Sequence, residues 1–390
     1  MSELNNKMRG RRWRLLGSVS ALALIAGLPG AVASEDRPIL WLELGGTAES
    51  VSGTGDRFTP PFTLLSPVPA PYSKESPIDA QQPPRFTYGG EGALTFQPED
   101  SDWQFSAAVR YGRSNNKRDT HHQTPLTYKI YDVAYKYYPS VARYITRTSA
   151  NYAETIVNQS EHHLIVDFQA GKDVGLGMFG HNGSSVLSAG VRVARFDFHS
   201  DVTIRARPTV IPTLTYVFGG LIPIPDFRWD SYYHHGSASR SFHGIGPSLS
   251  WKASEALFGN AQDGELSLDF GVNGALLFGK QKSRIHHHTT ARHYGGYKYE
   301  VPVPGYPTRD THYVQAYPPV TANLVRSRTV MVPNLGASIG ISYRVVDAKL
   351  SLGYRADYFF GAMDGGIDAA NKTSPAFNGL YASISIGLGD

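Results

Sequence analysis

Asp197 and His199 stand two residues apart, a spacing that places a general base and an orienting carboxylate on one face of a strand. A site that activates water for hydrolysis would also need a facing acidic pair, and no other expected strand carries one at the same end. The chain has no His-Glu-x-x-His motif. We therefore expect no catalytic residues, and a hydrolase borne on surface loops is the weakest alternative.

Histidine is the second residue type that could do chemistry. Nine of the 14 histidines cluster in the expected loops: His121-His122, His234-His235, His286-His287-His288, His293 and His312. Neutral imidazole binds Zn²⁺ and Cu²⁺, but adjacent histidines do not by themselves supply a tetrahedral ligand set. The absence of cysteine excludes thiolate ligands and disulfides. We expect solvated loop histidines, no metal site and no cofactor.

The elements that must position these residues are β-strands, because apolar and polar residues alternate with a period of two. Five stretches are clear, at 103–113, 265–279, 332–344, 348–360 and 378–388. Five more are less regular, at 38–47, 85–97, 161–171, 185–197 and 240–252. Each is about as long as a tilted strand that crosses a membrane. The pattern predicts an all-β fold, a transmembrane antiparallel β-barrel of about ten strands, with twelve as the upper alternative.

Short and long connections alternate along the chain. Residues 98–102 and 345–347 are tight turns, and 172–184 and 253–264 are modest connections. Long segments at 48–84, 114–160, 198–239 and 280–331 lie between them, and 361–377 is intermediate. Outer-membrane barrels have short periplasmic turns and long extracellular loops. A soluble β-sandwich has no reason to place its long loops in strict alternation.

The polar face of each expected strand would line the barrel lumen. Its ionisable members are Glu43, Glu91, Arg110, Asp167, Arg192, Asp269, Arg344, Arg355 and Asp357. Both signs occur, so ion pairs across the lumen are expected. About ten strands leave room for a narrow polar passage at most, since eight strands are just filled by side chains. A small pore and a plugged barrel both remain open.

Aromatic residues occur at both ends of the apolar face. Phe96, Trp103, Trp251 and Tyr343 lie toward one end, and Phe86, Tyr111, Phe278, Tyr358 and Phe360 lie toward the other. Two aromatic belts that flank an aliphatic band are typical of a protein that meets two bilayer interfaces.

Residues 1–33 have the pattern of a secretory signal peptide: a basic segment, the apolar run 15–28 and a small-x-small site at 31–33. Its removal takes away five of the 37 basic residues and one of the 33 acidic residues. The mature chain, 34–390, is then close to neutral and forms a single barrel domain. The basic excess is therefore no argument for nucleic-acid binding.

Three segments resemble a known family: Leu350 to Gly366, Val186 to Phe196, and Phe242 to Pro247. They are similar to the Legionella-type major outer-membrane proteins, and the similarity touches the strands from about residue 160 onward. The resemblance implies a pore-forming barrel in a Gram-negative outer membrane, without catalytic residues. The chain ends on Leu388-Gly389-Asp390, whereas such barrels commonly end on an aromatic residue.

We therefore predict a porin-like barrel that gives passive passage to ions or small polar solutes, with both termini in the periplasm. Its expected partners are outer-membrane lipids, the barrel-insertion machinery and the solutes themselves, and a homo-oligomer is an open alternative. The main rival is a structural or adhesive surface protein with a closed lumen.

Overall fold

The computed structural model describes residues 39–53, 83–98, 101, 103–131, 144–174, 184–217, 222–260, 263–299, 309–367 and 369–388. The expected signal peptide and most of the 48–84 segment lie outside these residues. Among the described residues, no helix is long and apolar enough to cross a membrane.

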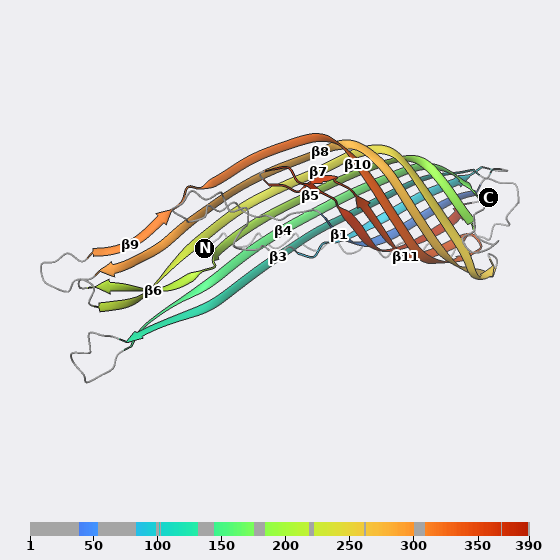
Figure 1. Cartoon of the computed structure of the whole chain (residues 1–390). Helices are drawn as coiled ribbons and strands as arrows, with labels where there is room; N and C mark the ends of the chain where they lie inside the picture. The colour runs from blue at the N-terminus through green and yellow to red at the C-terminus, as the bar shows by residue number, and fades with distance from the viewer. Residues whose placement is uncertain are drawn as a thin grey trace, which may run out of the picture.

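Ten antiparallel strands close into a barrel, as the alternation predicts (Figure 1). They are β1 (Ile39–Ser52), β2 (Phe86–Gln97), β3 (Trp103–Tyr131), β4 (Tyr144–Asp173), β5 (Ser184–Arg207), β7 (Ile222–Asn260), β8 (Gly264–Tyr299), β10 (Val320–Val345), β11 (Ala348–Phe359) and β14 (Ala376–Leu388). The first and last strands pair from Leu40 with Leu388 to Ser52 with Ala376, which closes the ring. Every strand of the ring thus has a hydrogen-bonded neighbour on both sides.

One section of the barrel carries an apolar band on its outer surface. On β10 the outward positions Leu335, Ile339 and Ile341 are about half exposed. The polar partners of the alternation point inward. The aromatic residues expected at the band's two ends also lie outward, with Phe96 38%, Trp103 49%, Tyr111 46% and Phe278 52% exposed. An outward apolar band with aromatic ends is the surface that a membrane-spanning barrel presents to lipid.

The outward side chains change character at one level around the barrel. On β5 the outward position Val191 is followed, four residues on, by Arg195, and on β8 the outward Phe278 is followed by Lys280. Beyond this level the outward residues are polar and many inward residues are apolar, such as Phe196 and Phe198. The reversal marks where the membrane-spanning part of each strand ends and the water-exposed part begins.

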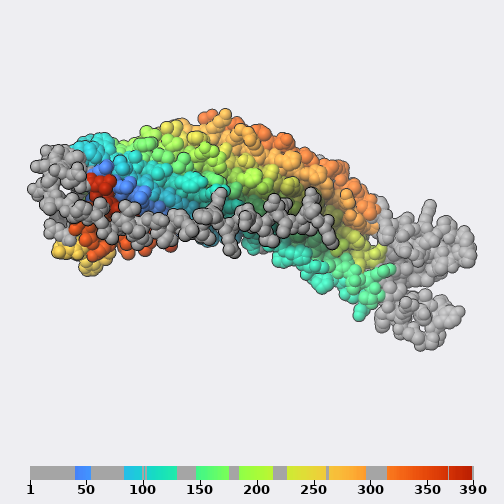
Figure 2. Space-filling view, turned by 180° about the vertical axis from the view of Figure 1, so that it is seen from behind, coloured from blue at the N-terminus to red at the C-terminus, as the bar shows by residue number. Residues whose placement is uncertain are grey.

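Six strands continue well past this level as an open sheet, which we call the extension. It consists of the far ends of β3, β4, β5, β7, β8 and β10, with the shorter strands β6 (Val210–Val217) and β9 (Arg309–Ala316) added at its edges. Figure 2 shows it running away from the barrel, with β10 and β9 along one margin and β3 and β4 along the other. Its inward face packs a second apolar cluster that includes Val157, Val202, Ile204 and Ile285.

The extension corrects the expectation of long loops. The segments 114–160, 198–239 and 280–331 are mostly strand wherever the structure describes them. In these segments the polar side chains point outward, and histidine and serine interrupt the alternation. The segments therefore lack the continuous apolar face that identifies a membrane strand. The paired backbone satisfies its own hydrogen bonds, and this stabilises sheet where loops were expected.

The short connections lie together at the other end of the barrel. The turn between β10 and β11 is tight, with Val346 at a φ of 50°, and β8 follows β7 after only residues 261–263. Both Ile39 and Leu388, the outermost described residues of the ring, lie at this end. The expected asymmetry of the two barrel ends is therefore present.

Lysine at Ile339 should lower the free energy of unfolding in lipid vesicles by about 2–4 kcal/mol, because the charge would face the bilayer midplane. Lysine at Val325, on the same face of β10 but in the extension, should change it by less than about 1 kcal/mol. Both side chains are at least half exposed in the native protein. Equal losses for the two variants would contradict the assigned membrane boundary.

Candidate functional site

The nine ionisable residues expected in the lumen all occupy inward-facing positions of the barrel strands. Glu43 and Glu91 come from β1 and β2, Arg110 from β3, and Asp167 and Arg192 from β4 and β5. The other four are Asp269 on β8, Arg344 on β10, and Arg355 and Asp357 on β11. The period of two in each strand positions them, because every second side chain points to the same face.

Three arginines form ion pairs within this polar layer. Arg110 Nη2 lies 2.7 Å from Asp357 Oδ2, and these two residues belong to strands four places apart in the ring. The Arg355 guanidinium donates to Glu91 Oε2 at 2.6 Å. Pairs of this length between separated strands reach across the lumen rather than along its wall.

Arg192 is the most highly connected side chain of the layer. Its guanidinium makes two hydrogen bonds to Asp167, at 2.7 and 2.9 Å. The same group donates to the side-chain oxygens of Asn273 and Asn334, on β8 and β10. One arginine thus ties the β4–β5 side of the barrel to the β8–β10 side.

The polar layer needs a residue without a side chain on β10. A methyl group at Gly336 would overlap the carboxylate of Asp357 and the amide of Asn273. Glycine therefore makes room for the carboxylate that Arg110 binds, which is a packing reason for a residue that is otherwise unfavourable in a strand.

The remaining three expected residues lie toward the end with the short turns. Lys349 Nζ lies 3.1 Å from Asp269 Oδ2, and the Ser383 hydroxyl donates to Glu43 at 2.6 Å. Arg344 Nε donates to the carbonyl oxygen of Val346 at 3.3 Å, and its guanidinium carbon lies 5.3 Å from the centre of the Trp41 ring.

Sequence reasoning missed a second polar cluster, which lies at the membrane boundary. His163 is fully buried, with Nδ1 2.8 Å from Glu161 Oε1 and Nε2 3.4 Å from Glu49 Oε2. Thr87 donates to the other oxygen of Glu161 at 2.7 Å. Glu161 and His163 lie in the expected strand 161–171, but the alternation is irregular at this end of it, so their inward direction was not recognised.

An apolar layer closes the lumen next to this cluster. Phe196 on β5 and Phe377 on β14 come from opposite sides of the ten-strand ring, and their ring centres are 5.3 Å apart. Phe359 packs edge-on against Phe196 at 4.5 Å. Phe242, Leu277, Val332 and Met363 belong to the same buried cluster. Contact between diametrically opposite strands leaves no open passage at this level.

The segment between β11 and β14 folds back into the barrel mouth above the apolar layer. We call residues 361–375 the plug hairpin; residue 368 lies outside the described part. It contains the two-residue strands β12 (Met363–Asp364) and β13 (Lys372–Thr373), which pair with each other. Met363 joins the apolar layer below, and Ile367 packs on the apolar cluster of the extension.

Arg326 on β10 holds the plug hairpin in place. Its Nε donates to Asp364 Oδ2, and its two terminal nitrogens donate to the carbonyl oxygens of Gly366 and Ile367, each at 2.6 Å. Arg240 on β7 donates to the Gly365 carbonyl at 3.2 Å. Asp364 also accepts the backbone N–H groups of Gly366 and Asn371, which fixes the turn of the hairpin. A cavity of about 70 Å³ lies beside it.

The charges of this clamp persist at neutral pH. Burial lowers the pKa of Arg240 to about 10, which leaves the guanidinium protonated. Burial alone would raise the pKa of Asp364, but the hydrogen bonds from Arg326 and two backbone N–H groups outweigh it and lower that pKa. The contribution of the ionised Asp364 to stability is therefore lost only when the pH falls below the ordinary pKa of Asp, 3.8.

Two histidines in the extension are buried, which corrects the expectation that all of them are solvated. His234 on β7 and His287 on β8 point inward with ring centres 6.2 Å apart, and His234 bonds to the Thr289 hydroxyl at 2.9 Å. Burial and, to a smaller extent, the nearby His287 lower the pKa of His234 to about 3. Within the described residues, no group of three or more His, Asp or Glu side chains is placed to hold a metal ion.

The candidate hydrolase residues are not arranged as a catalytic pair. Asp197 binds Arg195 at 2.8 Å, and His199 binds Asp201 at 3.0 Å, all on the exposed face of β5. Residues 336–340 match the Gly-x-Ser-x-Gly motif of a nucleophile elbow. They lie within β10, however, whereas the elbow requires a strand-to-helix turn.

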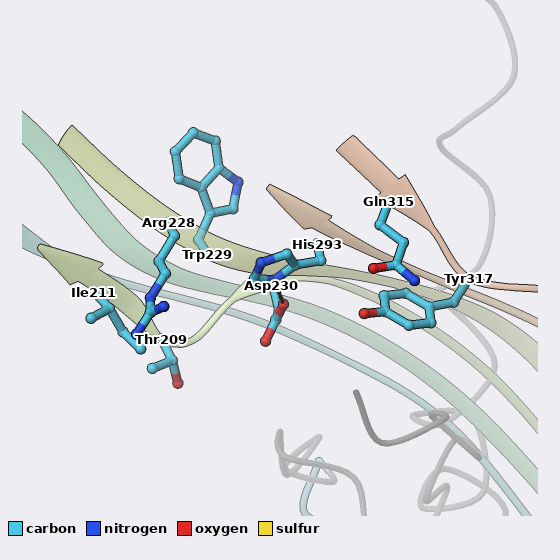
Figure 3. Close-up of a pocket in the computed structure, with 8 residues that line it drawn as sticks. All are labelled: Thr209, Ile211, Arg228, Trp229, Asp230, His293, Gln315 and Tyr317. Atoms are coloured by element: carbon cyan, nitrogen blue, oxygen red, sulfur yellow. Dashed lines mark hydrogen bonds and ion pairs between the residues drawn. The ribbon is translucent and has the colours of Figure 1, made fainter. Parts of the chain in front are cut away.

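A separate cleft of about 360 Å³ lies toward the far end of the extension (Figure 3). Its lining includes Arg228, Gln315 and Tyr317, and an ion pair in which His293 Nδ1 lies 2.7 Å from Asp230 Oδ1. Figure 3 shows Trp229 pointing away from Arg228 and Asp230. This polar cleft is remote from the lumen.

No family model matches the chain, and no curated protein matches it. The solved structures that align with it include the monoaromatic hydrocarbon channel CymD, at 9% identity over 91% of this chain and 90% of that one, with a TM-score of 0.20. A FadL homologue from Pseudomonas aeruginosa aligns at 11% identity over 90% of both chains, with a TM-score of 0.22. The P. putida toluene transporter TodX aligns at 7% identity over 92% and 91%, with a TM-score of 0.18.

Replacing Arg110 with Met should lower the free energy of unfolding by about 3–5 kcal/mol, because it leaves the carboxylate of Asp357 buried without its partner. Asp357→Asn in the same chain should recover part of that loss, since the neutral amide has a smaller desolvation cost. Denaturant titration of the refolded protein in detergent measures both. A double variant no more stable than the single one would contradict the pairing.

Acid should loosen the extension before the barrel. Because the folded state holds His234 with a pKa of about 3, against an ordinary 6.5, the unfolded segment binds the proton more readily. Stability is thus full above about pH 6.5 and falls as the pH drops from there toward 3. Limited proteolysis between pH 7.5 and 4.5 should show cleavage in β7 or β8 rising at low pH.

The matched variants for this test are His234→Gln and His235→Gln. His235 is the exposed neighbour on the same strand. Gln at 234 should flatten the pH dependence, whereas Gln at 235 should leave it as in the parent. The same pH dependence in all three proteins would rule out His234 as its source.

Proposed function

We propose that this protein is an outer-membrane β-barrel channel that passes ions or small polar solutes and is closed in the present conformation. The observation that carries the proposal is the lumen wall. Charged and polar side chains from most of the ring strands line it, from Lys349 and Asp269 near the short turns up to His163. Stability alone does not require so many desolvated ion pairs, since apolar packing is often as stable.

The closure consists of the apolar layer and the plug hairpin that sits on it. Beyond this point β1, β2, β11 and β14 have ended, so the remaining strands form an open sheet. Within the described residues, a solute that passes the closure would therefore meet no second closed ring of strands. Movement of the plug hairpin withdraws Met363 from the apolar layer, and the clamp that resists this movement is Arg326.

The proposed location follows from the surface. The apolar band faces lipid, the short turns and both described chain ends would face the periplasm, and the extension would face the outside. Residues 1–33 would direct export, and the barrel-insertion machinery would assemble the ring. The resemblance to the Legionella-type major outer-membrane proteins supports the pore-forming role. A homo-oligomer is compatible with this arrangement.

The second candidate is a surface protein with a permanently closed lumen. Two observations favour it: the contact between Phe196 and Phe377 across the ring, and the polar cleft at Asp230 and His293 on the extension. In that case the extension would carry the function, by binding a ligand on the cell surface. The two candidates differ in whether removal of the plug hairpin yields a conducting pore.

Replacing residues 362–373 with a short Gly-Ser linker should raise the single-channel conductance in planar bilayers severalfold over the intact protein, because it removes Met363 and the Arg326 partner together. Arg326→Ala should raise the frequency of brief openings. Arg205→Ala, an exposed arginine of the extension, is the matched control and should behave as the parent. A correctly inserted but silent linker variant would overturn the channel proposal in favour of the closed surface protein.

In the linker variant, Arg355→Gln should shift ion selectivity toward cations, because Glu91 would then lack its positive partner in the lumen. Reversal potentials in a salt gradient measure this shift. An unchanged reversal potential would place the conducting path away from Arg355.

A further inference from the structure

Three cations stand in a row on the outer surface of β8, directly past the end of the apolar band. Lys280, Lys282 and Arg284 alternate outward, so they are spaced about 7 Å apart along the strand. We call them the basic ladder. Two of them, Lys280 and Arg284, are exposed. No described carboxylate forms an ion pair with any of the three.

This lack of ion pairs contrasts with two other cations of the same surface. Arg195 on β5 is bound to Asp197 at 2.8 Å, and Lys117 on β3 is bound to Asp119 at 2.8 Å. On β7, β8 and β10, the described outward positions past the apolar band include no Asp or Glu. Within the described residues, the positive charge of the ladder is therefore not neutralised by a paired carboxylate.

Each cation has at least one hydroxyl-bearing residue beside it, and Lys280 also has an imidazole. By strand register, Lys280 stands between His243 and Thr329, and Lys282 stands between Ser241 and Ser327. Arg284 has Ser239 as its neighbour on β7. Ammonium and guanidinium groups interspersed with hydroxyl donors are the set that binds phosphate oxygens.

The row immediately below the ladder is apolar. Phe278 stands between Ile245 and Met331 in the register, and the three are 52%, 55% and 59% exposed. An acyl chain lying against this row would bring its headgroup to the level of Lys280. A free anion would use the cations alone, but only a lipid would use both rows.

We propose that the basic ladder is a binding site for the phosphate-bearing headgroup of an anionic lipid, with the acyl chains on the Phe278 row. The proposal rests on the membrane placement given above but not on conduction. The site would fix the depth of the barrel in the outer leaflet and recruit phosphorylated lipid to the β7–β8–β10 side.

The test is native mass spectrometry of the full chain refolded in detergent, titrated with phosphatidic acid, phosphatidylcholine or inorganic phosphate. The parent should retain phosphatidic acid at concentrations about 10–100-fold below those that the triple variant K280Q/K282Q/R284Q needs. Each cation near an anionic lipid surface strengthens binding several-fold, and the variant lacks three of them. The control K117Q/K129Q/R205Q removes the same charge from outward positions of the extension and should bind as the parent.

Two further measurements keep the proposal falsifiable. The charge-preserving variant K280R/K282R/R284K should bind phosphatidic acid as the parent, and raising the salt from 50 to 500 mM should weaken binding by the parent. Equal retention by the Gln variant and the parent would overturn the site. Equally tight binding of inorganic phosphate would overturn the role of the apolar row. Conductance of the Gln variant, measured in parallel, reports separately on the channel proposal.

Discussion

The structure depends on one constraint, the closure of the hydrogen-bonded ring. A strand edge cannot be left unpaired in lipid, because no water is present to satisfy its N–H and C=O groups. The pairing of β1 with β14 removes the last free edge of the membrane-spanning part. Once the ring is closed, each strand has one face toward lipid and one toward the lumen, and the alternation of side chains follows from this geometry.

The inner face then has to fill a narrow space with groups that satisfy one another. Arg110, Arg192 and Arg355 do this by reaching across to carboxylates and amides of other strands. Fixed pairs of this kind hold the wall in one arrangement, and they leave the lumen polar. The same narrowness lets Phe196 and Phe377 meet from opposite strands, so a few side chains and a short hairpin close the barrel.

Outside the membrane the outer face meets water instead of lipid, and its side chains are polar instead of apolar. The sheet keeps its period of two, but apolar residues such as Ile204 and Ile285 now face inward. The reversal gives the protein two surfaces with different tasks. The surface of the membrane-spanning part is apolar, and the surface of the extension carries charged groups such as the basic ladder.

The sequence by itself determined the ring of ten strands, the inward direction of the nine ionisable residues and the placement of the aromatic belts. These depend on a period of two within single strands, which is a local property. The extension was not predictable in the same way. Its polar side chains face outward and its apolar side chains inward, so a search for strands with a lipid-facing apolar side takes these segments for polar loops.

Only the tertiary structure decided which groups meet. That Arg110 binds Asp357, that Phe196 reaches Phe377, and that residues 361–375 fold back beneath Arg326 all depend on ring closure and register. Such contacts join residues far apart in the chain, and no local pattern encodes the distance between them. The sequence therefore determined what lines the lumen, and the closed ring decided that the lumen is shut.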